Sequence, residues 1–214
     1  MSTRTITDSQ GPALTGPGRM AREEAMKVAV DVMAMIGPFV ERAEIAGSLR
    51  RQRETVGDID IVAIPKAGGT VRIAAALRDL HCGAASDFRA GDKLQSAVVG
   101  HGRYGLCGPC GRGEREAQVD VYFATEEDFG MILCVRTGSA QHNVYMAQLC
   151  KRMGMKFAAG TGIETAKDAK NAKGRTEEEV FGAMGLLVPR PEDREIVCGI
   201  PKWMERPSVR KGQG

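Results

Sequence analysis

Two aspartates stand two residues apart at the start of an apolar run, in "DIDIVAIP" at positions 58–65. Side chains alternate across a strand, so Asp58 and Asp60 are predicted to project from one face. Two carboxylates held that close repel each other unless a cation neutralises them. A third carboxylate, Asp120, lies in "QVDVYFAT" (118–125), which also alternates like a strand. Carboxylate oxygens suit Mg²⁺, and three can hold two ions about 3.5–4 Å apart, which predicts a phosphoryl-transfer centre.

The stretch that precedes these aspartates, "GSLRRQRETVG" at 47–57, carries groups suited to phosphate. Gly47 lets the backbone approach an anion closely, and Ser48 offers a hydroxyl and an amide. Arginine guanidiniums make bidentate contacts with phosphate oxygens. Taken alone, a D-x-D pair is common by chance, and the arginines at 50–53 could form a solvated helical face. Their combination favours a triphosphate-binding loop beside a metal site.

Helices and strands that could position these residues can be read from apolar periodicity and from Gly and Pro stops. A helix is expected from Met20 onward, ending at Gly37-Pro38. Strands are expected at 43–47, 58–65, 93–101 and 118–125, with a helix at 70–80. Helices are also expected within 126–138 and 140–154. A T-x-x-E capping box at Thr176 and Glu179 predicts another helix start. Residues 158–175 and those beyond Pro189 are expected to be irregular.

These motifs closely resemble the signature of the family X DNA polymerases, in the polymerase-beta-like nucleotidyltransferase superfamily. The string "GSLRRQRETVGDID" (47–60) fits the pattern G-S-x-R-R…G-D-x-D of that family. The string "RTGSAQHN" (136–143) resembles its T-G-S-x-x-x-N segment, and "TEEEVFGAMGLLVPRPEDRE" (176–195) is similar to its closing segment. Only 46 residues precede Gly47, which predicts a minimal palm-plus-thumb member.

The resemblance implies an α/β (α+β) fold in which a mixed sheet with flanking helices forms the palm and a small α+β thumb follows. We expect a flexible tail at 1–18, a palm segment at 19–126, a thumb segment at 127–196 and a basic tail at 197–214. Site residues implied by the family pattern are the catalytic metal ligands Asp58, Asp60 and Asp120, the triphosphate contacts Gly47, Ser48, Arg51 and Gly57, and the nucleotide-lining residues Gly138, Ser139 and Asn143.

The implied activity is a Mg²⁺-dependent DNA nucleotidyltransferase that adds dNMP to a primer 3′-OH, in gap filling or end processing, and releases pyrophosphate. Mn²⁺ is expected to substitute for the two Mg²⁺ ions. Four positions depart from the family pattern, which often has an aromatic pair at Val135 and Arg136, an arginine at Ala147 and another arginine at Gln118. These departures leave two alternatives open: a template-independent transferase acting on another acceptor, and a non-catalytic DNA-end-binding module.

Composition sets the remaining expectations. A hydrophobic content of 43% with 27% charged residues and a net charge of +3 is typical of a folded globular protein. No apolar run suggests a membrane span or a secretion signal, so we expect a cytoplasmic monomer whose partners are DNA and dNTP, with reduced cysteines. Cys107 and Cys110 form one C-x-x-C pair, for which a pair of reduced thiols is favoured over a Zn²⁺ site.

Overall fold

The computed structural model of the 214-residue chain describes residues 19–81, 87–102, 105–107, 115–160, 162–165 and 174–195. The expected tails at 1–18 and 197–214 lie outside the described residues, as does Cys110 of the possible Zn²⁺ pair. The boundaries of the four expected segments stay a prediction. None of the helices in the described ranges combines the length and the apolar character that crossing a lipid bilayer requires.

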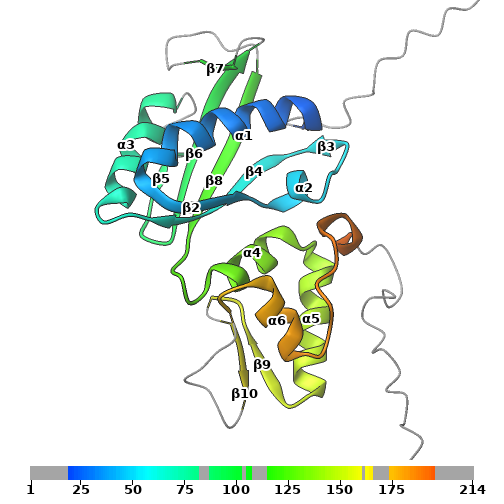
Figure 1. Ribbon diagram of the computed structural model, residues 1–214. Coiled ribbons are helices and arrows are strands. Elements are labelled where there is room, and N and C mark those ends of the chain that lie inside the picture. The colour runs from blue at the N-terminus through cyan, green and yellow to red at the C-terminus, as the bar shows by residue number, and fades with distance from the viewer. Residues whose placement is uncertain are drawn as a thin grey trace, which may run out of the picture.

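A six-stranded sheet with the order β2-β4-β8-β6-β5 forms the centre of the palm segment, and β7 pairs with β6 (Figure 1). Strands β4 and β8 run parallel, whereas every other pair in this sheet is antiparallel. The mixed sheet with flanking helices confirms the predicted fold class. The strands are β2 (Val40–Ile45), β4 (Asp58–Pro65), β5 (Arg89–Ala90), β6 (Leu94–Gly102), β7 (Gly105–Cys107) and β8 (Arg115–Phe123).

Helices α1 (Arg22–Ile36) and α3 (Gly69–Leu80) pack on one face of this sheet (Figure 1). In α1 the buried residues recur with the helical period, and the helix passes into a short 3-10 turn, η1 (Gly37–Phe39), where Pro38 follows Gly37. A small antiparallel pair, β1 (Met20–Ala21) with β3 (Thr55–Val56), closes the edge beside α1. The other face carries Asp58 and Asp60 at the start of β4 and the apolar residues Val62 and Ile64 farther along the same strand.

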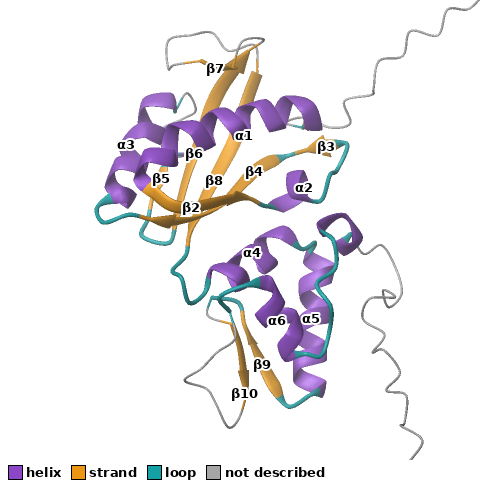
Figure 2. Ribbon diagram, in the orientation of Figure 1, coloured by secondary structure: helices purple, strands orange, loops and turns teal. Residues whose placement is uncertain are grey.

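The thumb segment places three helices around a second core (Figure 2). They are α4 (Phe129–Thr137), α5 (Ala140–Arg152) and α6 (Glu177–Ala183). A third apolar cluster joins Phe129 and Leu133 of α4 to Val62 and Ile64 of β4, so α4 packs against the sheet. The apolar face of one strand and that of one helix therefore hold the two segments together.

Two sequence expectations in the thumb segment were wrong. Within the region 158–175, expected to be irregular, β10 (Gly162–Thr165) pairs antiparallel with β9 (Met155–Ala158). Beyond Pro189, the chain forms a 3-10 helix, η3 (Pro191–Arg194), whose Arg194 side chain is fully buried. The hairpin depends on pairing between two short neighbouring strands, and the burial of Arg194 depends on its contacts with Glu177 and Pro189; apolar periodicity registers neither. The expected cap of α6 is confirmed, since the Thr176 hydroxyl accepts a hydrogen bond from the Glu179 amide at 3.2 Å.

Candidate active site

Three aspartates meet on the sheet face that α1 and α3 leave open. Strands β4 and β8 pair in register, so Asp60 lies beside Asp120, and Asp58 follows two residues earlier on β4. One carboxylate oxygen from each of the three lies within 4.8 Å of the others. Asp58 is exposed, and Asp60 and Asp120 are half-buried. The sequence predicted that these carboxylates share a site, and the register of two parallel strands is what brings them together.

Electrostatic repulsion within this cluster is strong. Burial, together with the neighbouring Asp58 and Asp120, raises the pKa of Asp60 to about 7. Asp120 is held in place by hydrogen bonds, from Ser96 Oγ at 2.6 Å, from Gln118 Nε2 at 2.9 Å, and from the Tyr122 hydroxyl at 3.3 Å. Three converging carboxylates form an oxygen donor set that suits a hard divalent cation such as Mg²⁺. A cation there would also remove the repulsion.

Gly47 begins α2 (Gly47–Arg50), the single helical turn that follows β2, and lies next to Asp60. Its φ of +61° is costly for any residue with a Cβ atom, and a Cβ built there would lie 2.0 Å from Asp60 Oδ2. The next residue, Ser48, has a buried hydroxyl with no hydrogen-bond partner among the described residues. Gly57 lies directly before Asp58 and faces Arg19, whose Nη1 would be 3.3 Å from an added Cβ. Gly47 of the motif therefore lies against Asp60, and Gly57 adjoins Asp58 in the chain.

Arg51, predicted to contact a triphosphate, makes two contacts within the protein. Its Nε donates to Glu195 Oε2 at 2.6 Å, and its Nη1 donates to the Thr137 carbonyl, also at 2.6 Å. The side chain is only 12% exposed. Arg53 is a second, longer partner of the same carboxylate, at 3.7 Å from Glu195 Oε1. Arg51 thus links the loop at 47–57 to the thumb segment.

Arg50 also reaches across to the thumb segment and joins a buried ionic network. It donates to both carboxylate oxygens of Glu177, at 3.1 and 2.9 Å, and to the Thr137 hydroxyl at 2.8 Å. The buried Arg194 donates to the same carboxylate and to the Pro189 carbonyl. Sequence reasoning missed the roles of Glu177, Arg194 and Glu195. The only signal was their place in the closing segment that resembles the family, since no spacing rule links them to Arg50 and Arg51.

The three predicted nucleotide-lining residues all make contacts within the thumb segment. Ser139 caps α5, because its hydroxyl accepts from the His142 amide at 3.1 Å, and it also donates to the Arg194 carbonyl at 2.9 Å. Asn143 donates to the Val135 carbonyl at 2.8 Å. A Cβ at Gly138 would lie 2.1 Å from the His142 ring, so only glycine fits there. These contacts give the segment a defined shape beside Thr137, and they leave its nucleotide-lining role a prediction.

The position where the family often has an aromatic residue, Arg136, lies against the palm segment. Its guanidinium is 3.8 Å from the centre of the Tyr122 ring, and Tyr122 in turn bonds to Asp120. Both residues border a cavity of about 430 Å³ at the junction of the two segments, with Lys93 and Asp128 also in its wall. An arginine stacked on tyrosine is a cation–π pair, so the departure at 136 has a partner within this chain.

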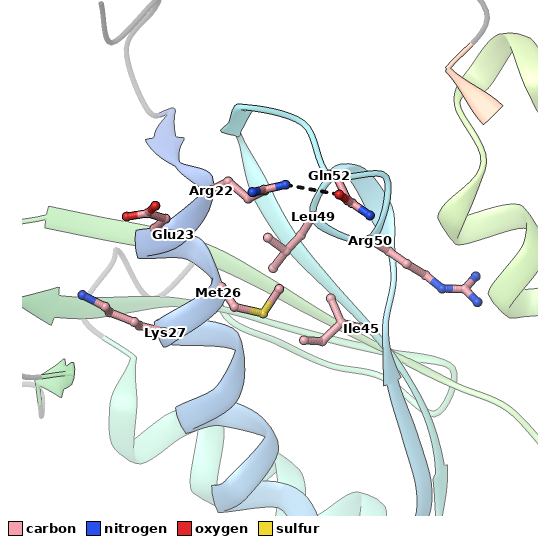
Figure 3. Close-up of a pocket in the computed structure, with 8 residues that line it drawn as sticks. All are labelled: Arg22, Glu23, Met26, Lys27, Ile45, Leu49, Arg50 and Gln52. Atoms are coloured by element: carbon pink, nitrogen blue, oxygen red, sulfur yellow. Dashed lines mark hydrogen bonds between the residues drawn. The ribbon is translucent and has the colours of Figure 1, made fainter. Parts of the chain in front are cut away.

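A second cavity, of about 650 Å³, lies on the other side of α2, against α1 (Figure 3). Met26, Ile45 and Leu49 supply its apolar floor, and Arg22 bonds to Gln52 at its rim. Figure 3 shows the Arg50 guanidinium pointing out of this cavity, toward the thumb segment. The aspartate cluster is not part of its lining. The polar chemistry of α2 is therefore directed at the junction between the segments.

Comparison with known proteins relates the chain to DNA polymerases. A family model described as DNA polymerase beta thumb matches residues 132–195. The chain is 30% identical over 196 residues to "DNA polymerase/3'-5' exonuclease PolX" of Bacillus subtilis (strain 168), covering 91% of this chain and 32% of that protein. It is 27% identical over 191 residues to DNA polymerase lambda of Rattus norvegicus, covering 83% of this chain and 33% of that one. The chain thus spans about a third of the length of these curated relatives.

The match to the thumb model covers residues 132–195, whereas Asp58, Asp60, Asp120 and the loop at 47–57 all lie before it in the chain. The two longer matches cover both parts. With the acidic cluster on β4 and β8 and the arginine loop beside it, these matches establish that the chain belongs to the family X DNA polymerases.

Proposed function

We propose that this protein is a metal-dependent DNA nucleotidyltransferase that adds dNMP to a primer 3′-OH and releases pyrophosphate. The observation that carries this proposal is the group of three carboxylates within 4.8 Å of one another, with Gly47 of the arginine loop against Asp60. The names of both relatives, PolX and DNA polymerase lambda, support the same reaction class. Gap filling or end processing of DNA is the setting we propose.

In this proposal Asp58, Asp60 and Asp120 hold two Mg²⁺ ions, for which Mn²⁺ can substitute. Bound divalent ions would neutralise charge on the phosphates and lower the pKa of the attacking hydroxyl. The protein itself then has mainly to position the reactants. The backbone of Gly47 and Gly57, the hydroxyl of Ser48 and the guanidinium of Arg51 bind the triphosphate. Gly138, Ser139 and Asn143 line the sugar and base.

The proposal is tested by primer extension with purified protein. A duplex with a one-nucleotide gap and a bare single strand are each offered single dNTPs or rNTPs, with Mg²⁺ or Mn²⁺. Insertion of the complementary base in the gap alone is the expected result. Stoichiometric DNA binding without metal-dependent turnover would instead identify a DNA-end-binding module and refute the proposal.

A template-independent transferase is the second candidate, and Arg136 is the observation that favours it. Arg136 stacks on Tyr122, so this position contributes no aromatic surface for a sugar, and Val135 and Ala147 are small. Addition to the bare strand, or equal use of all four bases, would select this candidate.

A monomeric state and a cytoplasmic location stay predictions, as do the palm and thumb boundaries.

A further inference from the structure

Glu195 forms an ion pair with Arg51, the arginine to which a phosphate is expected to bind. Its Oε2 lies 2.6 Å from Arg51 Nε, and Arg51 is nearly buried at the junction of the two segments. A guanidinium binds carboxylate and phosphate oxygens with the same donor groups. Arg51 Nε therefore cannot donate to Glu195 and to a phosphate oxygen at once.

The backbone that presents Glu195 is firmly held. Glu195 directly follows η3, and the neighbouring Arg194 is fully buried, with its guanidinium on Glu177 and on the Pro189 carbonyl. The Arg194 carbonyl also accepts from the Ser139 hydroxyl at 2.9 Å. With its neighbour fixed on both sides, the Glu195 carboxylate loses little conformational entropy when it binds Arg51, which makes it an effective internal anion.

A second arginine is placed to keep Glu195 paired if Arg51 turns to another anion. Arg53 Nη1 lies 3.7 Å from Glu195 Oε1, the oxygen that Arg51 Nε does not contact, and its side chain is 50% exposed. After this exchange of partners, the Glu195 carboxylate would still be paired with an arginine. Arg51 would also retain the Thr137 carbonyl as an acceptor for Nη1. Ser48, three residues away in the same loop, has a buried hydroxyl with no partner in the described part of the chain.

We propose that Glu195 is an internal competitor of the nucleotide triphosphate and that it sets the affinity of the site for polyphosphate anions. This inference rests on the proposed function, because it takes Arg51 as a triphosphate ligand. Polyphosphate binding displaces Glu195 from Arg51 and shifts it onto Arg53. The contact thus lowers nucleotide affinity and excludes weakly bound anions from the loop.

Calorimetric titration of the full chain with inorganic tripolyphosphate is the first test. The variant Glu195→Gln keeps the shape of the side chain and removes its charge. We expect it to bind tripolyphosphate about fivefold more tightly, because a charge-assisted hydrogen bond no longer has to be broken. Glu192→Gln is the matched control, since Glu192 lies in η3 and pairs with the exposed Arg190. Unchanged or weaker binding by Glu195→Gln would overturn the inference.

Steady-state kinetics separates competition from a structural role. Competition predicts a lower KM for dNTP in Glu195→Gln with an unchanged kcat, whereas a residue needed to hold the thumb segment would give a lower kcat or a higher KM. If Glu195→Gln folds poorly, Glu195→Asp retains the charge with a shorter reach and should bind tripolyphosphate with an intermediate gain. An Asp variant that binds less tightly than the wild type would contradict the proposal.

The same titration keeps failure of this inference apart from failure of the proposed function. Tighter tripolyphosphate binding by Glu195→Gln, in a protein that extends no primer, would leave the competition intact and refute the polymerase assignment. Primer extension by the wild type, with a KM for dNTP that Glu195→Gln does not lower, would support the polymerase assignment and refute the competition. Arg51→Gln should weaken tripolyphosphate binding, and binding that it leaves unchanged would remove Arg51 from the anion site and overturn the inference.

Discussion

Charged side chains gather in two regions of this molecule, and the two differ in how the charge is balanced. At the junction of the segments, Glu177 accepts from Arg50 and from Arg194, so each charge has an opposite partner. On the sheet, the carboxylates of Asp58, Asp60 and Asp120 converge, and in the described part of the chain none of them forms a salt bridge. The first arrangement is complete in itself, whereas the second needs a ligand to balance it.

The pKa shifts in the two regions have opposite signs for this reason. Burial alone would raise the pKa of Glu177, but hydrogen bonds from Arg50 and Arg194 hold it below its usual value. Burial raises the pKa of Asp60 to about 7, and its carboxylate neighbours add to the effect. Hydrogen bonds from cationic partners offset the cost of burying a carboxylate such as Glu177. A carboxylate that is surrounded by other carboxylates, such as Asp60, destabilises the fold, and a bound cation would offset that cost.

The largest expected effect is on turnover. Replacing Asp60 with Ala should lower primer extension by at least about 1000-fold, because metal-ion stabilisation of the transition state contributes several kcal/mol. Thermal unfolding without metal should show a fold at least as stable as the wild type, since repulsion is relieved. Asp79→Ala, an exposed aspartate on α3, serves as the control. Retained activity in Asp60→Ala would refute the metal assignment.

Glu177→Gln should mainly lower the stability of the fold. Removing one partner of a buried ionic network leaves Arg50 and the fully buried Arg194 without their counter-charge, which costs about 3 kcal/mol or more. Urea unfolding measures this loss. Glu178→Gln, the exposed neighbour in the first turn of α6, should change the unfolding free energy by less than about 0.5 kcal/mol. Equal effects of the two variants would mean that the network is not stabilising.

Gly47→Ala tests how closely the loop is fitted to the acidic cluster. An alanine at φ +61° is strained by about 1–2 kcal/mol, and its Cβ would also collide with Asp60. Gly68→Ala carries similar strain at φ +70°, but nothing lies within 4 Å of its Cβ. The two variants should lose comparable stability from strain, while Gly47→Ala alone should bind Mg²⁺ more weakly. Mg²⁺ titration calorimetry distinguishes them, and identical Mg²⁺ affinities would contradict the fit.

Stability should depend on pH through Asp60 in metal-free protein. The pKa of Asp60 is about 7 in the fold and about 3.8 in its usual environment, so the folded state binds more protons between these values. Stability from this group is therefore present at low pH and is lost as pH rises from about 4 to about 7. Asp60→Asn should stabilise the protein more at pH 8 than at pH 5, as urea unfolding in EDTA would measure. A difference independent of pH would exclude this titration.

The smallest stability effect is expected at Ser48. Its hydroxyl has no partner among the described residues, so Ser48→Ala should change the unfolding free energy by less than about 0.5 kcal/mol while weakening tripolyphosphate binding. Ser139→Ala removes an N-cap and should cost about 1 kcal/mol. If Ser48→Ala left tripolyphosphate binding intact, Ser48 would have no part in the site.

Part of the candidate site could be predicted locally, because Gly47, Ser48, Asp58 and Asp60 lie in one short stretch. The alternation of "DIDIVAIP" predicted that Asp58 and Asp60 share a face, and the structure agrees. The helix stop at Gly37-Pro38 and the cap at Thr176 were local signals, and both are observed. The hairpin of β9 and β10 could not be predicted, since pairing depends on a partner strand and not on the strand's own pattern.

The sequence by itself determined the ligand types, their spacing along β4 and the family to which the motifs point. Only the tertiary structure decided that Asp120 stands beside Asp60, through the parallel register of β4 and β8, and that Glu195 faces Arg51. The physical reason is the range of the forces involved. Side-chain alternation and capping act over a few residues and leave a local pattern, whereas ion pairs across the junction join residues 144 positions apart, and no local pattern records them.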